Sequence, residues 1–273
     1  MTSVPTQTID RGLPDRDAVA ASLQRVLEQA TAAGATAAGA TMSISVGLSV
    51  TVRAGDVESV EFQRDRDLSL TAYRGQRSGS ASSADWSEAS LNEVVERALA
   101  ISSHTGEDRY AGLPDAARQA SDFPDLDLHH PWSLSVADAI DIALACEAAA
   151  LAADPRVHQS EGATVSTHAG LTLLANTQGF VGHRLGTSHS LSCSVLAKSG
   201  DEMQRDYWYS SARRHEDLQA AADIGQLAGE RAASRLGARS IATASMPVIY
   251  VPELARGLFG HLLAAISGGN LYR

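Results

Sequence analysis

The sequence predicts an α+β fold with two lobes, in each of which helices pack against an antiparallel meander of strands. Apolar residues recur at three- and four-residue steps in several segments, as in amphipathic helices. Between these segments lie stretches that alternate apolar and polar residues and are separated by turn residues, as in antiparallel strands. The order helix, meander, helix occurs in residues 14–104 and again in residues 135–236. Two lobes of similar size are therefore expected.

The composition favours a globular protein and argues against a nucleic-acid binder. Of the 273 residues, 44% are hydrophobic and 20% are charged, which is enough apolar mass for a folded core. The 22 basic and 32 acidic side chains give a formal net charge of -10. Proteins that bind a phosphate backbone depend on excess Lys and Arg, so direct binding of DNA is not expected.

The cysteines and the missing targeting patterns indicate a cytoplasmic protein. Cys146 and Cys193 lie far apart in the sequence, without the spacing of a zinc site or of a disulfide framework. The N-terminal residues lack the basic and then apolar order of a secretory signal. The longest apolar run, residues 140–153, contains Glu147 and is too short to cross a membrane.

The first lobe is assigned to residues 14–118. Residues 14–34 and 87–103 predict amphipathic helices that bury one apolar face. A small, polar strand at residues 76–84 would lie at a sheet edge or line a groove. Three alternating strands with intervening turns complete this lobe, namely strands 41–53, 57–64 and 68–73 and turns 54–56 and 65–67.

The second lobe is assigned to residues 119–238. The proline-containing stretch 106–132 has no periodicity and predicts a linker or a segment that wraps around the lobes. Helices are expected at 135–153, buried between layers, and at 217–236. Residues 157–213 predict a meander of about five strands, because turn residues occur at 169–170, 177–179, 185–186 and 199–201.

Residues 240–273 predict the start of a further domain. Residues 246–251 are expected to form a short buried strand, and Pro252 opens a helix over residues 253–266 that ends at two glycines.

Several histidines are candidate metal ligands. If residues 185–187 formed a hairpin turn, His183 and His189 would face each other on neighbouring strands, a geometry that zinc can use. No third ligand can be named, so two polar residues on a solvated sheet face are the favoured interpretation. His104, His129 and His130 lie near a helix end or in the linker without accompanying carboxylates.

The helix predicted at residues 253–266 contains one more candidate, His261. A helical zinc-peptidase site needs two histidines, with a glutamate beside the first to polarise the zinc-bound water. The position of the first histidine holds Arg256, a permanent cation that would repel a divalent metal. The next position holds Gly257, which has no carboxylate. No metal is therefore expected here, and no catalytic residue.

Several separated segments, in order along the chain, resemble the TldD/PmbA family, and the last two are similar to its PmbA (TldE) branch. The likeness covers nearly the whole chain from about Asp15 onward. The segments are RAGDVESVE at 53–61, LTAYRGQRSGSAS at 70–82, EDRYAGLP at 107–114, MQRDYWYS at 203–210 and ISGGNLYR at 266–273.

This resemblance implies a cytoplasmic zinc peptidase built as a heterodimer, which acts on unfolded or modified peptides. The implied substrates include precursors of ribosomally made peptide antibiotics and antitoxins, and family members are also described as modulators of DNA gyrase. In the TldD branch the metal helix carries an H-E-x-x-x-H motif. Aligned here, the motif falls on Arg256, Gly257 and His261, of which only His261 matches. The resemblance therefore implies a zinc-free, non-catalytic subunit whose TldD-like partner holds the zinc.

The resemblance also implies that relatives continue into a β-rich C-terminal domain, so residues 240–273 are expected to be the start of a truncated one. The last helix would then expose its apolar face, which comprises Leu258, Phe259, Leu262 and Leu263.

Three hypotheses of function follow. The first is a subunit that pairs with the TldD-like peptidase and binds an extended peptide, for example along the open edge at residues 76–84. The second is a non-proteolytic adaptor that modulates DNA gyrase or toxin–antitoxin systems. The third is an independent metal hydrolase that uses His183 and His189. Direct contacts with nucleic acid or membrane are not expected under any of them.

Overall fold

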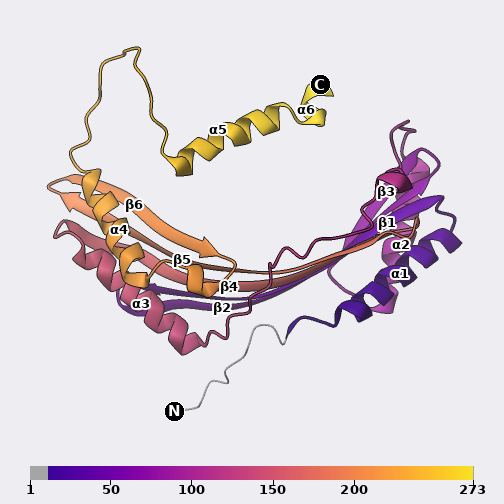
Figure 1. Cartoon of the computed structure of the whole chain (residues 1–273), viewed down its shortest axis with the longest axis horizontal. Coiled ribbons are helices and arrows are strands. Elements are labelled where there is room, and N and C mark those ends of the chain that lie inside the picture. The colour runs from indigo at the N-terminus through magenta and orange to yellow at the C-terminus, as the bar shows by residue number, and fades with distance from the viewer. Residues whose placement is uncertain (1–11, 273) are drawn as a thin grey trace. The chain divides into compact units, whose positions relative to one another are not determined.

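The computed structural model describes residues 12–272 (Figure 1). The chain divides into two compact units, one ending at Leu236 and one beginning at Gly237. The α+β fold class is confirmed. None of the helices in the described residues is both long and apolar enough to cross a bilayer.

The first unit is built on one antiparallel sheet of six strands in the order β3-β2-β1-β4-β5-β6. Because β1 pairs with β4 from Gly39↔Asn176 to Val52↔Ala163, both meanders lie in the same sheet. The strands are β1 (Ala37–Arg53), β2 (Asp56–Arg74), β3 (Arg77–Ser83), β4 (Val157–Asn176), β5 (Val181–Ser199) and β6 (Glu202–Ala212). The division into lobes at residues 118 and 238 stays a prediction.

Four helices accompany this sheet, and three of them begin at a side-chain cap. Asp15, Ser87 and Ser135 each accept a hydrogen bond from the backbone N–H three residues later, which satisfies a donor that the first helical turn leaves unpaired. The helices are α1 (Arg16–Ala32), α2 (Glu88–His104), α3 (Val136–Ala152) and α4 (Ala221–Ser234), with short 3-10 turns at Ala116–Arg118 and His215–Asp217.

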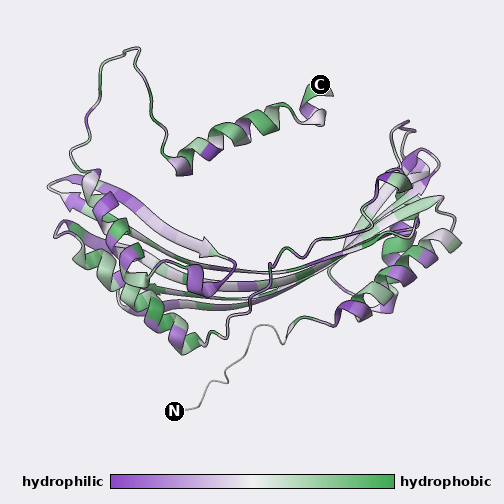
Figure 2. Cartoon of the chain, in the orientation of Figure 1, coloured by the Kyte–Doolittle hydropathy of each residue, from purple (hydrophilic) through white to green (hydrophobic). Residues whose placement is uncertain are grey.

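All four helices cover the same face of the sheet. The even-numbered side chains of β1 are buried from one end of the strand to the other. Ala38 to Ile44 belong to a core with α1 and α2, whereas Leu48 to Val52 belong to a second core with α3 and α4. Figure 2 shows hydrophobic and hydrophilic residues mixed along α1, and a largely hydrophobic α3. None of these four helices lies on the opposite face, which carries the odd-numbered side chains of β1 and is called the helix-free face below.

The strands are longer than the sequence predicts. Residues 65–67 continue β2 instead of turning, because they pair with residues 43–45 of β1. The three pairs are Asp67↔Ser43, Arg66↔Ile44 and Asp65↔Ser45. Both faces of β2 are exposed there, so a strand can carry polar residues at every position. The sequence pattern is then the same as that of a turn.

The second meander has three strands, and the prediction of about five was wrong. Gly170 lies inside β4 and Gly186 inside β5, where the two residues pair with each other. Both glycines lie within regular strand pairing on the helix-free face, where no side chain is needed to fill a core. The sequence pattern could not separate this use of glycine from a turn.

The stretch between α2 and α3 wraps around the first unit, as the sequence predicts. It begins at the β2–β3 turn, where the N–H of Asp108 donates to the carbonyl of Gln76 at 2.9 Å. Further on, the Phe123 ring meets the edge of Phe180 with centroids 5.9 Å apart. The N–H of Thr187 then donates to the carbonyl of Leu128 at 2.8 Å, so the segment lies beside β5 at this point.

The second unit contains α5 (Pro252–Ala265) and the short α6 (Gly268–Tyr272). The expected strand at residues 246–251 is wrong, since these residues are exposed and form no strand. A short apolar run forms a strand only when a neighbouring strand pairs with it, and none does so within the described residues. The prediction that Leu258, Phe259, Leu262 and Leu263 are exposed on α5 is confirmed.

Candidate functional site

The residues at which the sequence predicts an altered zinc-peptidase motif lie on α5, which begins after Val251 with Pro252 in its first turn. Arg256, Gly257 and His261 are all exposed. A β-carbon added to Gly257 would meet nothing within 4 Å. A zinc ion of the kind that the resemblance implies does not fit these residues, because one imidazole is accompanied by a permanent cation and by no carboxylate. Among residues 12–272, no group of three or more His, Cys, Asp and Glu could hold a metal ion.

His183 and His189 do not face each other across neighbouring strands, so that expectation was wrong. Both lie on β5, where His183 pairs with Leu173 and His189 pairs with Thr167. Six residues of one strand separate them by about 20 Å, too far for a shared metal ion. The turn expected at residues 185–187 is a continuous piece of strand.

His189 has a structural role instead. Its ring is fully buried, Nδ1 lies 2.8 Å from the Thr167 hydroxyl, and Nε2 lies 2.9 Å from the carbonyl of His130. A carbonyl only accepts, so Nε2 carries the proton and Nδ1 accepts from Thr167. Burial lowers the pKa of His189 below its ordinary value, and the nearby His215 adds to this effect. The ring therefore fastens the wrapping segment to β5 in its neutral form.

The two cysteines, which are distant in the sequence, meet in the core between α3 and β5. Both are free and buried. A hydrogen bond with Cys146, together with burial, raises the pKa of the Cys193 thiol. Both thiols are buried away from solvent, which excludes them as nucleophiles.

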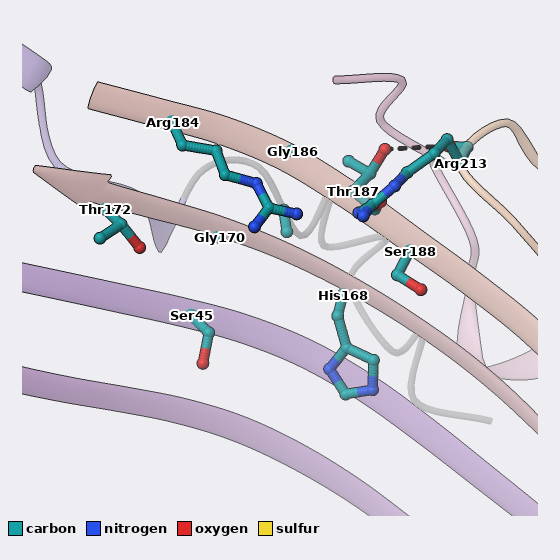
Figure 3. Close-up of a pocket in the computed structure, with 10 residues that line it drawn as sticks. Ser45, His168, Gly170, Thr172, Arg184, Gly186, Thr187, Ser188 and Arg213 are labelled. Atoms are coloured by element: carbon teal, nitrogen blue, oxygen red, sulfur yellow. Dashed lines mark hydrogen bonds between the residues drawn. The ribbon is translucent and has the colours of Figure 1, made fainter. Parts of the chain in front are cut away.

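The most distinctive polar site is a cavity on the helix-free face of the sheet (Figure 3). Its volume is about 230 Å³. Serine, threonine, glycine and histidine form most of the wall, and two arginines complete it. The lining residues used below are Ser45 from β1, His168, Gly170 and Thr172 from β4, Arg184, Gly186 and Ser188 from β5, and Arg213, which follows β6.

The strand register places these side chains together. Gly170 pairs with Ser45 on one side and with Gly186 on the other, so three short residues stand in one row. In the adjacent row His168 pairs with Gly47 and Ser188. Directly paired residues point to the same face. Gly170 therefore leaves the sheet surface open between the larger side chains, whereas Leu128 of the wrapping segment lies against Gly186.

The imidazole of His168 has its place because Gly47 has no side chain. A β-carbon built on Gly47 would lie 2.1 Å from His168 Nδ1 and 2.6 Å from Cε1. The ring thus lies over the backbone of β1, at the floor of the cavity. Figure 3 shows it below Ser188 and beside Ser45.

The two arginines reach the cavity from different segments. Arg184 extends from β5, and its side chain makes no hydrogen bond or ion pair within residues 12–272. Arg213 donates from Nη1 to the carbonyl of Thr187 at 2.6 Å, and the same Nη1 lies 3.7 Å from the position of a β-carbon on Gly186. No Asp or Glu of the described chain is among the lining residues. The cavity is therefore a cationic site with free donors.

Sequence reasoning missed this cavity. A usable signal was present in β1, where the even positions are apolar and the odd positions 39–51 are only Gly, Ser and Thr. That alternation predicts a face that is covered on one side and lined with small polar groups on the other. The glycines taken as turn signals concealed the continuity of β4 and β5, and with it the proximity of His168 and Arg184.

The strand expected at residues 76–84 to lie at an edge is β3, and it is an edge strand. It pairs only with β2, from Leu68↔Ser83 to Arg74↔Arg77. Within residues 12–272 no strand pairs with its other side, although the carbonyl of Ser78 accepts a hydrogen bond from the Thr105 hydroxyl at 2.9 Å. The remaining outer backbone groups could pair with another extended chain.

Comparison with known proteins identifies the family. A family model described as the PmbA/TldA metallopeptidase central domain matches residues 129–236, and one described as PmbA/TldA metallopeptidase domain 1 matches residues 42–102. The Haemophilus influenzae "Metalloprotease PmbA homolog" is 40% identical over 247 residues, 90% of this chain and 54% of that protein. "Metalloprotease PmbA" of Escherichia coli O157:H7 is 40% identical over 257 residues, 92% of this chain and 57% of that protein.

Solved structures share the fold. A proposed modulator of DNA gyrase from Bacteroides thetaiotaomicron superposes with a TM-score of 0.76 at 26% identity, over 82% of this chain and 52% of that one. TldE from Thermococcus kodakarensis superposes with a TM-score of 0.63 at 12% identity, over 77% and 47%. The chain spans about half the length of the curated relatives it matches.

The matched domains and the curated relatives thus define a protein related to metallopeptidases. The chain belongs to the PmbA/TldD family.

Proposed function

We propose that this chain is a non-catalytic subunit of a TldD/TldE-type zinc peptidase complex of the cytoplasm. The observation that carries the proposal is the motif on α5, where Arg256 and Gly257 occupy the positions of a zinc ligand and of the acid that activates water. His261 alone provides one of the three or more ligands that a zinc site requires. The zinc ion and the hydrolysis of the peptide bond then belong to a TldD-like partner.

In this proposal the chain helps to bind an extended peptide that its partner cleaves. Two features support the role. The outer edge of β3 can add a further strand through backbone hydrogen bonds, which bind many sequences alike. The helix-free face presents short polar side chains along most of β1, so an extended chain can approach the sheet closely. The substrates would be unfolded or modified peptides.

The experiment is co-expression with the TldD-like protein of the same organism, each in the form that the organism makes. We expect the two proteins to purify together, with zinc bound only by the partner, and the complex to cleave an unfolded peptide. His261→Ala in this chain should leave the rate unchanged, whereas the loss of either histidine of the partner's H-E-x-x-x-H motif should abolish it. Stoichiometric zinc and peptidase activity in this chain alone would refute the proposal.

The alternative is a non-proteolytic adaptor, which is supported by the gyrase-modulator names of two structural neighbours. Co-purification with DNA gyrase, and not with a TldD-like protein, would favour it.

A further inference from the structure

We propose that the cavity between Arg184 and Arg213 binds the carboxylate of an extended peptide. The inference deepens the proposed function, on which it rests for the origin of the ligand. It concerns the helix-free face of the sheet and not the α5 motif.

The first argument is the unbalanced charge of the cavity. Figure 3 shows the guanidinium groups of Arg184 and Arg213 turned toward the same space, above Gly170 and Gly186. Arg213 gives one hydrogen bond to the carbonyl of Thr187, and most donors of both groups stay free. Two like charges that face a shared cavity repel each other, and a bound anion would remove that repulsion. Planar guanidinium groups hold a carboxylate through paired N–H···O bonds.

The second argument is the shape of the floor. Gly170 and Gly186 pair across β4 and β5. The wrapping segment lies against Gly186, where a β-carbon would be 3.4 Å from the Leu128 carbonyl oxygen and 3.5 Å from the Leu128 β-carbon, so the open part of the floor is at Gly170. A peptide backbone can therefore lie against the sheet at this point. The hydroxyls of Ser45 and Ser188 and the His168 imidazole stand around the floor and can donate to the second carboxylate oxygen or to the last peptide carbonyl.

The third argument is the charge on the neighbouring strand, which limits the kind of anion. Asp65 and Asp67 pair with Ser45 and Ser43 of β1 and so belong to the same face as the cavity. They lie on β2, three strand spacings or about 14 Å from β5. A polyanion such as a nucleic acid or an acidic membrane would meet these carboxylates, and the whole chain carries a net charge of -10. A single carboxylate bound between Arg184 and Arg213 would lie away from Asp65 and Asp67.

The test uses calorimetric titration of the 273-residue chain at low salt with two matched tetrapeptides, acetyl-Ala-Gly-Ala-Ala as the free acid and as the C-terminal amide. We expect the acid to bind about tenfold more tightly than the amide. The proton signals of the His168 ring should shift with the acid only, which locates the binding. An amide with an internal Asp separates the two sources of the carboxylate. Binding of that peptide would assign the site to acidic side chains as well as to chain ends.

Arg184→Gln is the informative variant, because Arg184 makes no contact that the fold needs. It should weaken binding of the acid about threefold to fivefold, the range of one exposed charge pair. Arg97→Gln on α2 removes the same charge from another face and should leave binding unchanged. Equal affinity for the acid and the amide would overturn the inference, as would an equal loss of affinity in Arg184→Gln and Arg97→Gln. Binding of inorganic phosphate without binding of the peptide acid would also overturn it. Because no partner is present, a failed titration leaves the proposed subunit role untouched.

Discussion

The ring of His168 lies over Gly47, in the space that a side chain at position 47 would occupy. A β-carbon there would come within 2.1 Å of Nδ1 and within 3.1 Å of Cγ. The floor of the arginine cavity therefore depends on a glycine of the neighbouring strand. This dependence leads to a first prediction.

Gly47→Ala should force the His168 ring off the sheet. We expect the free energy of unfolding to fall by about 1–3 kcal/mol, as for other overpacked positions, and the signals of the His168 ring to move in NMR spectra. Urea unfolding measures the first effect. Gly106→Ala is the matched control, since a β-carbon there meets nothing within 4 Å. An unchanged stability of Gly47→Ala would show that the ring can leave freely.

Glu147→Ala should loosen the turn between β1 and β2. The buried carboxylate of Glu147 on α3 accepts hydrogen bonds from the N–H groups of Ala54 and Gly55, both at 2.8 Å. These residues have positive φ angles of 54° and 84°, and a fixed acceptor helps to hold them. Removal should cost about 1.5–3 kcal/mol, as for hydrogen bonds to a charged group.

Hydrogen exchange at residues 54 and 55 should become faster in Glu147→Ala, and this separates a local effect from general destabilisation. Glu96→Ala, on the exposed side of α2, provides the control and should change neither stability nor exchange. Slow exchange of both amides in Glu147→Ala would contradict the role given to this carboxylate.

Gly229→Ala should separate α4 from α3. A β-carbon at Gly229 would lie 2.4 Å from the carbonyl oxygen of Ala150 and 2.6 Å from the β-carbon of Ala153, so the two helix backbones must move apart. The control is Gly260→Ala on α5, where a β-carbon meets nothing. Alanine favours helix over glycine by about 1 kcal/mol. Thermal unfolding should thus show destabilisation for the first variant, and circular dichroism no loss of helix for the second.

The helices could be predicted from the sequence because each buries one stripe of apolar residues at a regular spacing. The buried residues of α1, Val19, Leu23, Val26, Leu27 and Ala30, are the ones that the pattern selects. The middle of β2 was mistaken for a turn, because a strand that is exposed on both faces can carry polar residues at every position. The interiors of β4 and β5 were mistaken for turns, because glycine occurs in regular strands as well as in turns. Strand pairing supplies the missing information, and it is not local in sequence.

The candidate site residues also fall into those that a sequence motif reveals and those that only the folded chain brings together. Arg256, Gly257 and His261 are close enough in the sequence for a motif to reveal them. Arg184 and Arg213 lie on different segments and meet only through the turn that returns β6 beside β5. No spacing rule connects them, so the cavity could be found only from the folded chain.

His189 provides the last prediction, a pH dependence of stability. Burial, the largest effect, holds the pKa of His189 below its ordinary value of 6.5 in the folded chain. The unfolded chain therefore binds a proton at a pH at which the native ring stays neutral. Stability should be at its full value above about pH 6.5 and should fall as the pH decreases below it, by at most about 1.4 kcal/mol per pH unit for one proton. The decrease should stop below the native pKa.

His189→Gln removes the titrating group and should flatten this part of the stability profile, measured by urea unfolding from about pH 7.5 to about pH 5, a range that spans the ordinary histidine pKa. His158→Gln, at an exposed position of β4, should retain the slope of the unmodified chain. Since the neutral ring joins Thr167 to the carbonyl of His130, acid should also lower the protection of the amides in residues 128–132 against hydrogen exchange, after correction for the intrinsic dependence of exchange on pH. Parallel profiles for the unmodified chain and His189→Gln would show that the proton is taken up elsewhere, and the wrapping segment would then be fastened by Thr187 and Leu128 rather than by the imidazole.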